Sequence, residues 1–233
     1  MSPGIDDAQR SAAKIAAIAY PVALGLVATA NFGLRGDLTV DGDAAETARR
    51  IAAAVGEFRL SVVFDLLYAA GLVVLLAALY VVLRPVNRYL ALLAAVLKLI
   101  YAATAVLVAL SSLSILRLAS DPAYAQGLGP DALHALVGLH SSIAWDQYYA
   151  GLTFWALSSC VFAWLWLKSR YIPAPLAAFG LLASAWCAFC AVAYIANPGF
   201  ANVVNVWVFD MPMALFYLAL SGWLLFRGLG PRD

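Results

Sequence analysis

Apolar runs of about 20 residues recur along the whole chain, and they limit its possible folds more than any other feature. A run of this length crosses the hydrocarbon core of a bilayer as an α-helix. Only 12% of the 233 residues are charged, whereas soluble domains have about 25%. The chain therefore has too little polar surface for a water-soluble globule. We expect an all-α transmembrane bundle of about six spanning helices, forming a single domain over residues 1–233.

Helix breakers separate the apolar runs. Arg84-Pro85 divides the second run from the third, and Asn197-Pro198-Gly199 closes the fifth. The expected spans cover residues 14–32, 58–83, 89–113, 143–167, 173–196 and 203–226. The fourth helix has Asp131 as its earliest possible start. We expect the two longer connecting segments, 34–57 and 117–132, to be loops on one side of the membrane.

Basic residues are more frequent on one side of the expected bundle. With six spans, both termini and the two short turns share a side, which holds Arg10, Lys14, Arg84, Arg88, Lys168, Arg170, Arg227 and Arg232. The other side holds Arg35, Arg49, Arg50, Arg59 and Arg117. Because short cytoplasmic segments are enriched in Lys and Arg, this bias predicts that both termini are cytoplasmic. The two longer loops then face outward.

Apart from Lys14 and Arg59 at the ends of spans, four charged residues lie inside the expected spans, each on a different helix: Asp65, Lys98, Asp146 and Asp210. A charged side chain at mid-bilayer costs about 2.5–3.5 kcal/mol on insertion scales, so such residues are functional candidates by default. At 1.5 Å per residue, the three aspartates lie roughly 24–31 Å from the cytoplasmic ends of their helices. This depth is the outer part of a hydrocarbon core that is about 30 Å thick.

This agreement in depth predicts one polar pocket near the outer face. Lys98 lies roughly 14 Å from the cytoplasmic end of its helix, and its long stem lets the ammonium group reach toward the carboxylates. The candidate acid–base residues are Asp65, Asp146, Asp210, Lys98 and Glu57. The candidate substrate-binding residues are Arg59, His140, Asn31, Tyr148, Tyr149 and Trp207.

The same charges also allow a purely structural interpretation. Asp65 with Lys98, and Asp146 with Arg59, would then be ion pairs that hold helices together without another task. Three carboxylates in one low-dielectric pocket would repel each other, however, and such sites are suited to acid–base chemistry or proton coupling.

Other classes of site have little support in the sequence. The net charge of +1 gives no electrostatic footprint for nucleic acid, so membrane lipids and a lipophilic small molecule are the expected partners. His134 and His140 are six residues apart and do not share a helix face, so we expect no metal site and no cofactor. Small residues such as Gly25, Gly71 and Gly180 allow close helix packing, within one chain or in a homodimer.

Three functions remain open at this point. The first is a cofactor-independent acid–base enzyme, an isomerase or cyclase, that acts on a lipophilic, isoprenoid-like substrate. The second is a proton- or ion-coupled transporter or channel with Asp65, Lys98 and Asp210 as a relay. The third is a non-catalytic protein that binds or senses a lipid or small ligand.

Several short motifs resemble those of a known family: Asp43-Ala44-Ala45-Glu46-Thr47, Glu57-Phe58-Arg59, Phe64-Asp65-Leu66-Leu67, Leu83-Arg84-Pro85-Val86-Asn87-Arg88 and Tyr171-Ile172-Pro173. The family is a widespread group of small polytopic bacterial membrane proteins, described as a domain of unknown function. The resemblance covers most of the chain and implies a multi-helix protein of the bacterial inner membrane. It also implies that Glu57, Arg59, Asp65 and Asp146 are among the characteristic polar positions. It implies no activity.

Overall fold

The computed structural model of the chain describes residues 5–230, except for the side chains of residues 125, 198, 201, 206 and 207. Arg232, which we counted among the basic residues of the cytoplasmic side, lies outside the described residues. The described part is helical and contains no β-strand. This confirms the predicted all-α fold.

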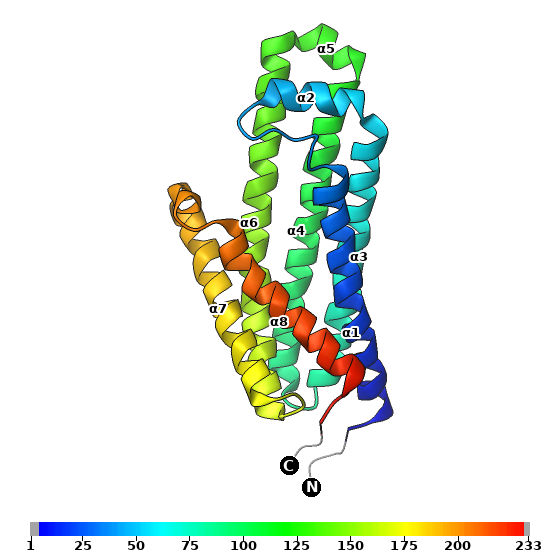
Figure 1. The fold of residues 1–233 in the computed structure, drawn as a ribbon, viewed down its shortest axis with the longest axis vertical. Helices are drawn as coiled ribbons and strands as arrows, with labels where there is room; N and C mark the ends of the chain where they lie inside the picture. The colour runs from blue at the N-terminus through cyan, green and yellow to red at the C-terminus, as the bar shows by residue number, and fades with distance from the viewer. Residues whose placement is uncertain (1–4, 231–233) are drawn as a thin grey trace. The chain divides into compact units, whose positions relative to one another are not determined.

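Six helices are long and apolar enough to cross a membrane, as predicted (Figure 1). The six helices are α1 (Asp7–Ala28), α3 (Val55–Leu83), α4 (Arg88–Ser120), α6 (Pro130–Ser169), α7 (Ala174–Ala196) and α8 (Val206–Phe226). The π-helical turn, Thr29–Leu34, extends the first span to Leu34.

Both segments that we expected to be loops contain a short helix. Helix α2 (Ala44–Ala53) lies in the first, and its start is capped by the Asp43 carboxylate, which accepts a hydrogen bond from the backbone N–H of Glu46 at 2.9 Å. Helix α5 (Pro122–Leu128) lies in the second, where the Asp121 carboxylate accepts from the backbone N–H of Ala123 at 3.0 Å. An aspartate at the N-cap supplies an acceptor to N–H groups that have no partner within the helix.

Two of the helices are longer than a bilayer requires. Helix α4 has 33 residues and α6 has 40, so they are about 50 and 60 Å long. The hydrocarbon core is only about 30 Å thick, so parts of both helices extend beyond it. Helix α6 begins at Pro130, next to Asp131, the earliest start that the sequence allowed, because no breaker interrupts the turns between Asp131 and the apolar span from residue 143.

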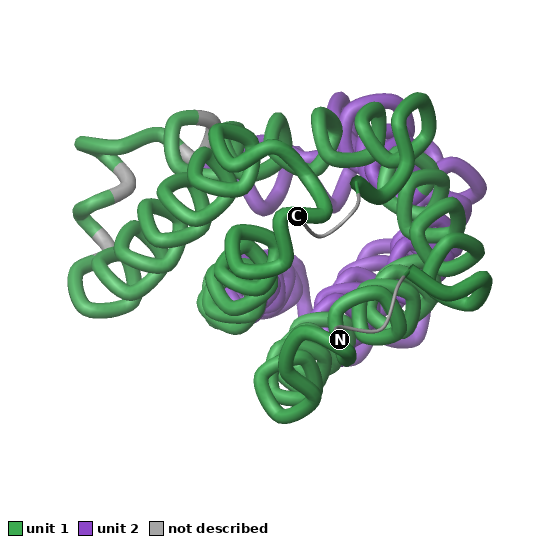
Figure 2. The backbone as a smooth tube through the Cα atoms, turned by 90° about the horizontal axis from the view of Figure 1, so that it is seen from below, with its two compact units in different colours: residues 1–22, 70–102, 149–233 green, residues 23–69, 103–148 purple. Residues whose placement is uncertain are grey.

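The chain is divided into two compact units, which are described separately (Figure 2). Unit 1 comprises residues 1–22, 70–102 and 149–233, and unit 2 comprises residues 23–69 and 103–148. The prediction of a single domain stays a prediction.

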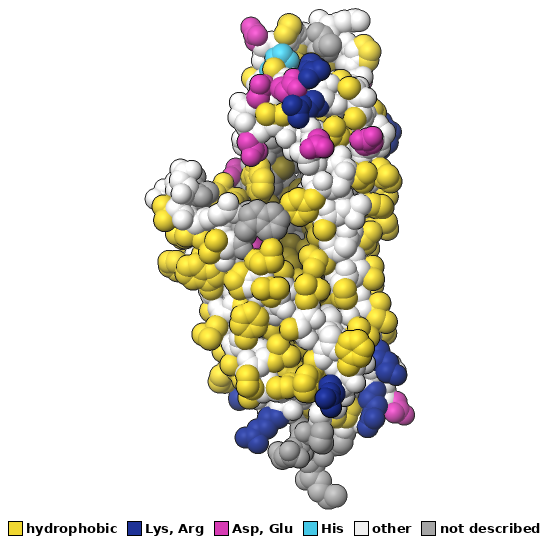
Figure 3. Space-filling model, viewed as in Figure 1, with side chains coloured by type: hydrophobic (Ala, Val, Ile, Leu, Met, Phe, Trp, Pro, Cys, Tyr) yellow, Lys and Arg dark blue, Asp and Glu magenta, His cyan; other side chains and the backbone are white. Residues whose placement is uncertain are grey.

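In unit 1, one end is tied together by hydrogen bonds between segments far apart in the sequence. The side-chain amide of Gln9 donates to the backbone carbonyl of Val82 at 2.9 Å and to the hydroxyl of Tyr171 at 3.2 Å. The backbone N–H of Gly230 donates to the carbonyl of Tyr171 at 2.8 Å. The start of α1, the end of α3, the α6–α7 turn and the segment after α8 therefore meet at this end, where Lys and Arg side chains gather (Figure 3).

Large apolar side chains remain exposed on the long helices of unit 1. On α7, Leu182 is 71% exposed and Phe189 is 60% exposed, and on α4 the leucines Leu92, Leu93 and Leu99 are about half exposed. A soluble protein would bury such faces, whereas lipid tails cover them. The exposure therefore agrees with a chain whose helices are surrounded by lipid.

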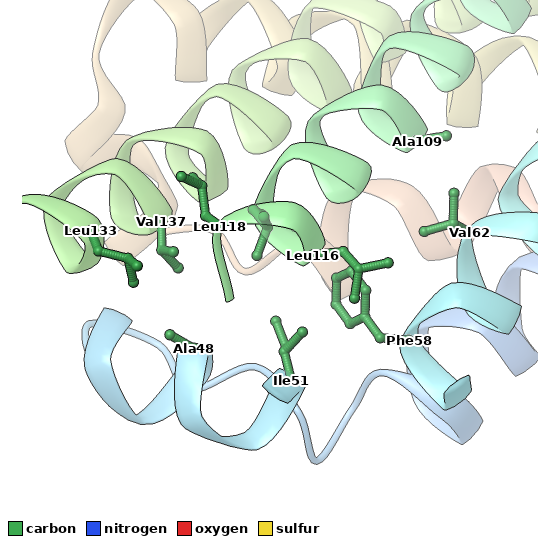
Figure 4. Packing of buried hydrophobic residues seen from close by; sticks show 10 residues of the cluster. Ala48, Ile51, Phe58, Val62, Ala109, Leu116, Leu118, Leu133 and Val137 are labelled. Atoms are coloured by element: carbon green, nitrogen blue, oxygen red, sulfur yellow. The ribbon is translucent and has the colours of Figure 1, made fainter. Parts of the chain in front are cut away.

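Unit 2 has a hydrophobic cluster of its own, to which α2, α3, α4 and α6 contribute (Figure 4). Helix α2 contributes Ala48 and Ile51, which are three residues apart and therefore share a helix face. They point toward residues of the other helices, including Phe58, Leu116 and Val137. Burying this face stabilises a helix of only ten residues, which would be marginal alone in water.

Candidate functional site

Lys98 is completely buried in unit 1 and is bonded to neutral hydroxyl groups. Its Nζ lies 2.7 Å from the hydroxyl oxygen of Tyr217 and 3.5 Å from that of Ser159. These two hydroxyl oxygens are themselves 2.7 Å apart and hydrogen-bonded. Within the described part of the chain, no carboxylate forms an ion pair with Lys98. We call Lys98, Tyr217 and Ser159 the lysine site.

Aromatic rings surround the amine of the lysine site. Nζ lies 4.6 Å from the centre of the Tyr217 ring, 5.3 Å from that of Trp155 and 6.0 Å from that of Phe162. The Tyr20 ring of α1 stacks on the Tyr217 ring, with 4.8 Å between the ring centres. Helix α1 is thus the fourth helix, after α4, α6 and α8, that contributes a side chain here. Ring faces are electron-rich and stabilise a cation by electrostatic attraction. The surroundings of Lys98 can therefore hold an ammonium group that lacks a carboxylate partner.

Helical spacing explains why these side chains meet. Trp155, Ser159 and Phe162 are four and three residues apart on α6, so they occupy one face. Lys98 is about 15 Å from the start of α4, Ser159 about 15 Å from the end of α6, and Tyr217 about 14 Å from the end of α8. These distances are half the thickness of the hydrocarbon core, so the lysine site lies near the middle of the membrane.

Helix α8 has a proline between Asp210 and Tyr217, and α7 compensates for it. Pro212 has no N–H, so the carbonyl of Val208 loses its partner within the helix. The indole N–H of Trp186 on α7 donates to that carbonyl at 3.3 Å. A hydrogen bond from α7 to α8 thus replaces the one that Pro212 cannot form within α8. Asp210 lies two residues before Pro212 and is half-buried.

Unit 2 contains a second polar group, the ion pair of Arg35 and Asp65. The guanidinium of Arg35 donates to the Asp65 carboxylate and, at 3.0 and 3.2 Å, to the hydroxyl of Ser61. The Asn31 side-chain oxygen accepts from the same guanidinium at 3.4 Å, and its carbon Cζ lies 5.3 Å from the centre of the Phe58 ring. The side chains of Arg35 and Asp65 are only 12% and 9% exposed, respectively. The structure therefore gives Asp65 a partner other than Lys98, which we had considered.

The remaining predicted residues are distributed over both units. In unit 2, Glu57, Arg59 and Asp146 are exposed, His140 and Tyr148 are half-buried, and Asn31 contributes to the Arg35 ion pair. In unit 1, Tyr149 is buried and stacks on Tyr194 at 3.4 Å. The side chain of Trp207 lies outside the described part of the chain. In unit 2, the candidates Asp65 and Asn31 both accept hydrogen bonds from Arg35, whereas in unit 1 Lys98 is bonded to residues that were not predicted.

Four residues of these two polar groups were not among our candidates: Tyr217, Ser159, Arg35 and its partner Ser61. Arg35 lies four residues after Asn31, one helical turn away, which was a usable signal. Ser159 shares a face with Trp155, and Tyr217 is two turns from Asp210 on the same helix, but neither spacing identifies a partner for Lys98. Among the described residues, no three His, Cys, Asp or Glu side chains are grouped so that they could hold a metal ion.

The six apolar helices and the polar groups between them define a multi-pass membrane protein. A family model described as a domain of unknown function, DUF4386, matches residues 15–228, so the chain belongs to this family. This confirms the resemblance that the motifs indicated. No curated protein and no solved structure matches the chain.

Proposed function

We propose that this protein is a proton-coupled membrane transporter in which Lys98 binds and releases the proton. The observation behind this proposal is a fully buried lysine, bonded to the hydroxyls of Tyr217 and Ser159 near mid-membrane. Ionisable residues inside a membrane are costly and are found mainly on ion, proton or substrate pathways. Transporters commonly have their binding sites at this depth.

The chemistry of the lysine site supports two protonation states. A hydroxyl both donates and accepts hydrogen bonds, so Tyr217 can accept from an ammonium group or donate to a neutral amine. The oxygens of Ser159 and Tyr217 are 2.7 Å apart, and either can be the donor of the hydrogen bond between them. When Tyr217 changes from acceptor to donor toward the amine, Ser159 can therefore become the donor to Tyr217. The rings of Trp155 and Phe162 stabilise the charged state without forming a permanent ion pair. A carboxylate at this place would instead favour the charged state alone.

Asp210 supplies the next protonatable group along α8. It is seven residues before Tyr217, which is two helical turns and about 10 Å along the axis. Residues at this spacing face the same side of a helix. We infer that Asp210 exchanges protons with the lysine site, with water or the transported solute bridging the distance.

The enzyme that the sequence led us to consider first has less support. Two of its candidate acid–base residues, Glu57 and Asp146, are exposed, and Asp65 is paired with Arg35. An acid–base enzyme needs a group that is free to exchange a proton with a bound substrate. A ligand-binding role without catalysis is compatible with both polar groups, but no described contact favours it over transport.

Proton movement in liposomes tests the proposal. The purified protein is reconstituted with a pH-sensitive dye inside, and a potassium gradient with valinomycin drives protons inward. Metal cations, amino acids and organic anions are then added one at a time. We expect acidification with the wild type, either directly or on addition of a coupled solute, and none with Lys98→Met.

A matched variant separates the lysine site from a general loss of charge. Lys168→Met also removes one lysine, but Lys168 is exposed and its amine lies over the face of Trp164. We expect it to retain wild-type flux, and Lys98→Arg to be inactive because arginine does not release its proton. Wild-type flux in folded Lys98→Met, or no protein-dependent flux under any of these conditions, would refute the proposal.

A further inference from the structure

Neutral groups hold the guanidinium of Arg35 in unit 2, whatever the charge of Asp65. Its Nε and Nη2 donate to the hydroxyl oxygen of Ser61 at 3.2 and 3.0 Å, and its Nη1 donates to the side-chain oxygen of Asn31 at 3.4 Å. The guanidinium carbon lies 5.3 Å from the centre of the Phe58 ring. Ser61 donates its own proton to the backbone carbonyl of Phe58 at 2.7 Å, so it can only accept from Arg35. The cation therefore stays in place when Asp65 changes its charge.

Asp65 uses only part of the binding capacity of this guanidinium. One carboxylate oxygen, Oδ2, accepts from one nitrogen, Nη2. Arginine has five N–H donors, and its strongest pairing with a carboxylate uses two parallel hydrogen bonds. Nη1 has two N–H groups but, among the described residues, a single acceptor, the Asn31 oxygen at 3.4 Å. A second anion therefore finds a donor at Nη1, beside Asp65, and the pair is not sealed, because Arg35 is 12% exposed and Asp65 is 9% exposed.

Two anions beside one buried guanidinium are stable only when one of them is protonated. Their negative charges repel each other, whereas arginine keeps its proton in proteins. An anion that binds at Nη1 therefore replaces Asp65 as the counter-charge of Arg35, and Asp65 takes up one proton. Binding of the anion and binding of the proton are thus coupled.

No other charge in the described part of unit 2 is placed to take over either role. Arg35 is the only group there that forms an ion pair with Asp65. Tyr68, three residues further along α3, shares its helix face and is neutral near pH 7. On the same helix, Glu57 and Arg59 are exposed. The charged or titratable groups of the neighbouring helices that form no ion pair with Asp65 include Arg50 on α2, Arg117 on α4, and His140 and Asp146 on α6.

The depth of the pair and the coupling to one proton indicate the class of anion. Asp65 is about 27 Å from the end of α3 at Leu83, so it lies close to the far boundary of a hydrocarbon core that is about 30 Å thick. A water-soluble anion therefore reaches it without crossing the core. One proton on Asp65 balances one negative charge, which is the charge of a carboxylate, whereas a phosphate group bears about 1.5–2. The planar fork of a guanidinium also matches a planar carboxylate.

We propose that Arg35 binds the carboxylate of a small organic acid while Asp65 takes up one proton. This inference rests on the proposed function in one respect, namely that the acid is the solute that the protein transports with protons. The binding step itself needs neither Lys98 nor a membrane, so it is measured on the purified protein in mild detergent.

Asp65→Asn provides the first test, because asparagine has the shape of a protonated aspartate and bears no charge. Acetate should supply the counter-charge that Arg35 then lacks. We expect the melting temperature of Asp65→Asn to rise by about 3–5 °C for each tenfold increase in acetate concentration above its Kd. Sodium chloride at the same ionic strength should raise it less, because a spherical ion does not match the planar fork.

Two controls accompany this test. The double variant with Asp65→Asn and Arg35→Met lacks the cation as well, so acetate should not stabilise it. Arg117→Gln removes an exposed arginine of unit 2, on the last turn of α4, and should respond to acetate as the wild type does.

The wild type provides a second test, which does not depend on the stability of a variant. Acetate must compete with ionised Asp65, so its apparent affinity should rise about tenfold for each unit by which the pH is lowered from about pH 8 to about pH 6, where acetate itself remains ionised. A pH indicator in weak buffer should record about one proton taken up for each acetate bound. The affinity of Asp65→Asn for acetate should not change with pH.

Equal stabilisation by chloride, stabilisation of the double variant by acetate, or acetate binding to the wild type without proton uptake would overturn the inference. Lys98→Met separates this inference from the proposed function, because it should abolish proton flux in liposomes and leave acetate binding unchanged. A wild type that transports protons but does not bind acetate would refute this inference alone. Acetate binding without proton flux would refute the proposed function and leave the binding step supported.

Discussion

Gly180 allows α7 and α8 to pack closely, and Gly180→Ala is the change whose effect is best defined by the structure. A Cβ atom at this position would lie 2.4, 2.5 and 2.7 Å from three carbons of the Phe216 ring. Carbon atoms make favourable contact at about 3.5–4.0 Å, so the ring would have to move by about 1 Å. Phe216 is only 1% exposed, and the Tyr217 ring lies beside it at 5.2 Å between ring centres. The ring therefore has no free space to enter.

The expected cost follows from two opposing effects. Overpacking of a well-filled core costs about 1–3 kcal/mol, and a ring displaced by this much belongs near the upper end. Alanine is favoured over glycine inside a helix by about 0.5–1 kcal/mol. We therefore expect Gly180→Ala to lower the free energy of unfolding by about 2–2.5 kcal/mol.

Gly222→Ala is the matched control, because it places the same methyl group inside α8 with nothing within 4 Å of the new Cβ. It should stabilise the protein by about 0.5–1 kcal/mol through helix propensity alone. Equilibrium unfolding in mixed micelles with increasing SDS, and thermal unfolding in mild detergent, measure both variants. Because Phe216 is next to Tyr217, Gly180→Ala should also reduce proton flux in liposomes.

A second substitution tests the cause of this effect. Phe216→Leu removes the ring carbons that Cβ would meet, so Gly180→Ala should cost little or nothing in that background. If Gly180→Ala unfolds at the same point as Gly222→Ala, the close contact between α7 and α8 does not exist as described.

Three further predictions concern unit 2. Asp65→Asn should lower the free energy of unfolding by roughly 3 kcal/mol in SDS titrations, because it leaves Arg35 buried without a counter-charge. The double variant with Asp65→Asn and Arg35→Met should be less destabilised than Asp65→Asn alone. The guanidinium of Arg49, and after it that of Arg50, hold the pKa of Glu46 at about 2, below its ordinary value of 4.5. The ion pairs of α2 should therefore be intact above about pH 4.5 and lost as the pH falls toward 2. ¹³C NMR of labelled glutamate measures this pKa, and an ordinary value would contradict the pairing. Ile51→Ala should lower the free energy of unfolding by about 2–5 kcal/mol and speed hydrogen exchange of the backbone amides of α2. Exchange rates equal to those of the wild type would show that the cluster in Figure 4 does not hold this helix.

The six spans could be predicted because a membrane span depends on local properties, the length and apolarity of one segment. The two short helices were missed for a different reason. Asp43 and Asp121 are good N-caps, but each is followed by so few residues that propensity alone does not make the helix stable. Helix α2 depends on packing of Ala48 and Ile51 against other helices, which a local pattern does not reveal.

The depth of Lys98 was predictable, whereas its partners were not. The expectation of nearby carboxylates came from depth alone, and depth says nothing about the rotation of each helix. Ser159 and Tyr217 are 61 and 119 residues away, and two hydroxyl groups in apolar helices give no signal by themselves. Arg35 was counted only as a loop charge, because the π-helical turn that continues α1 to Leu34 was not expected.

The distance in sequence between Lys98 and its partners has a consequence for biosynthesis. Tyr217 is made 119 residues after Lys98, which at about 5–20 residues per second is a delay of about 6–24 s. Helix α4 must therefore leave the insertion machinery with an unpartnered amine, or wait beside it until α6 and α8 arrive. The mean hydropathy of 2.3 over an 18-residue stretch of α4 offsets the cost of one lysine, so α4 can enter the bilayer alone. Assembly of the lysine site is then a late event, in which α8 brings Tyr217 to an amine that is already in the membrane.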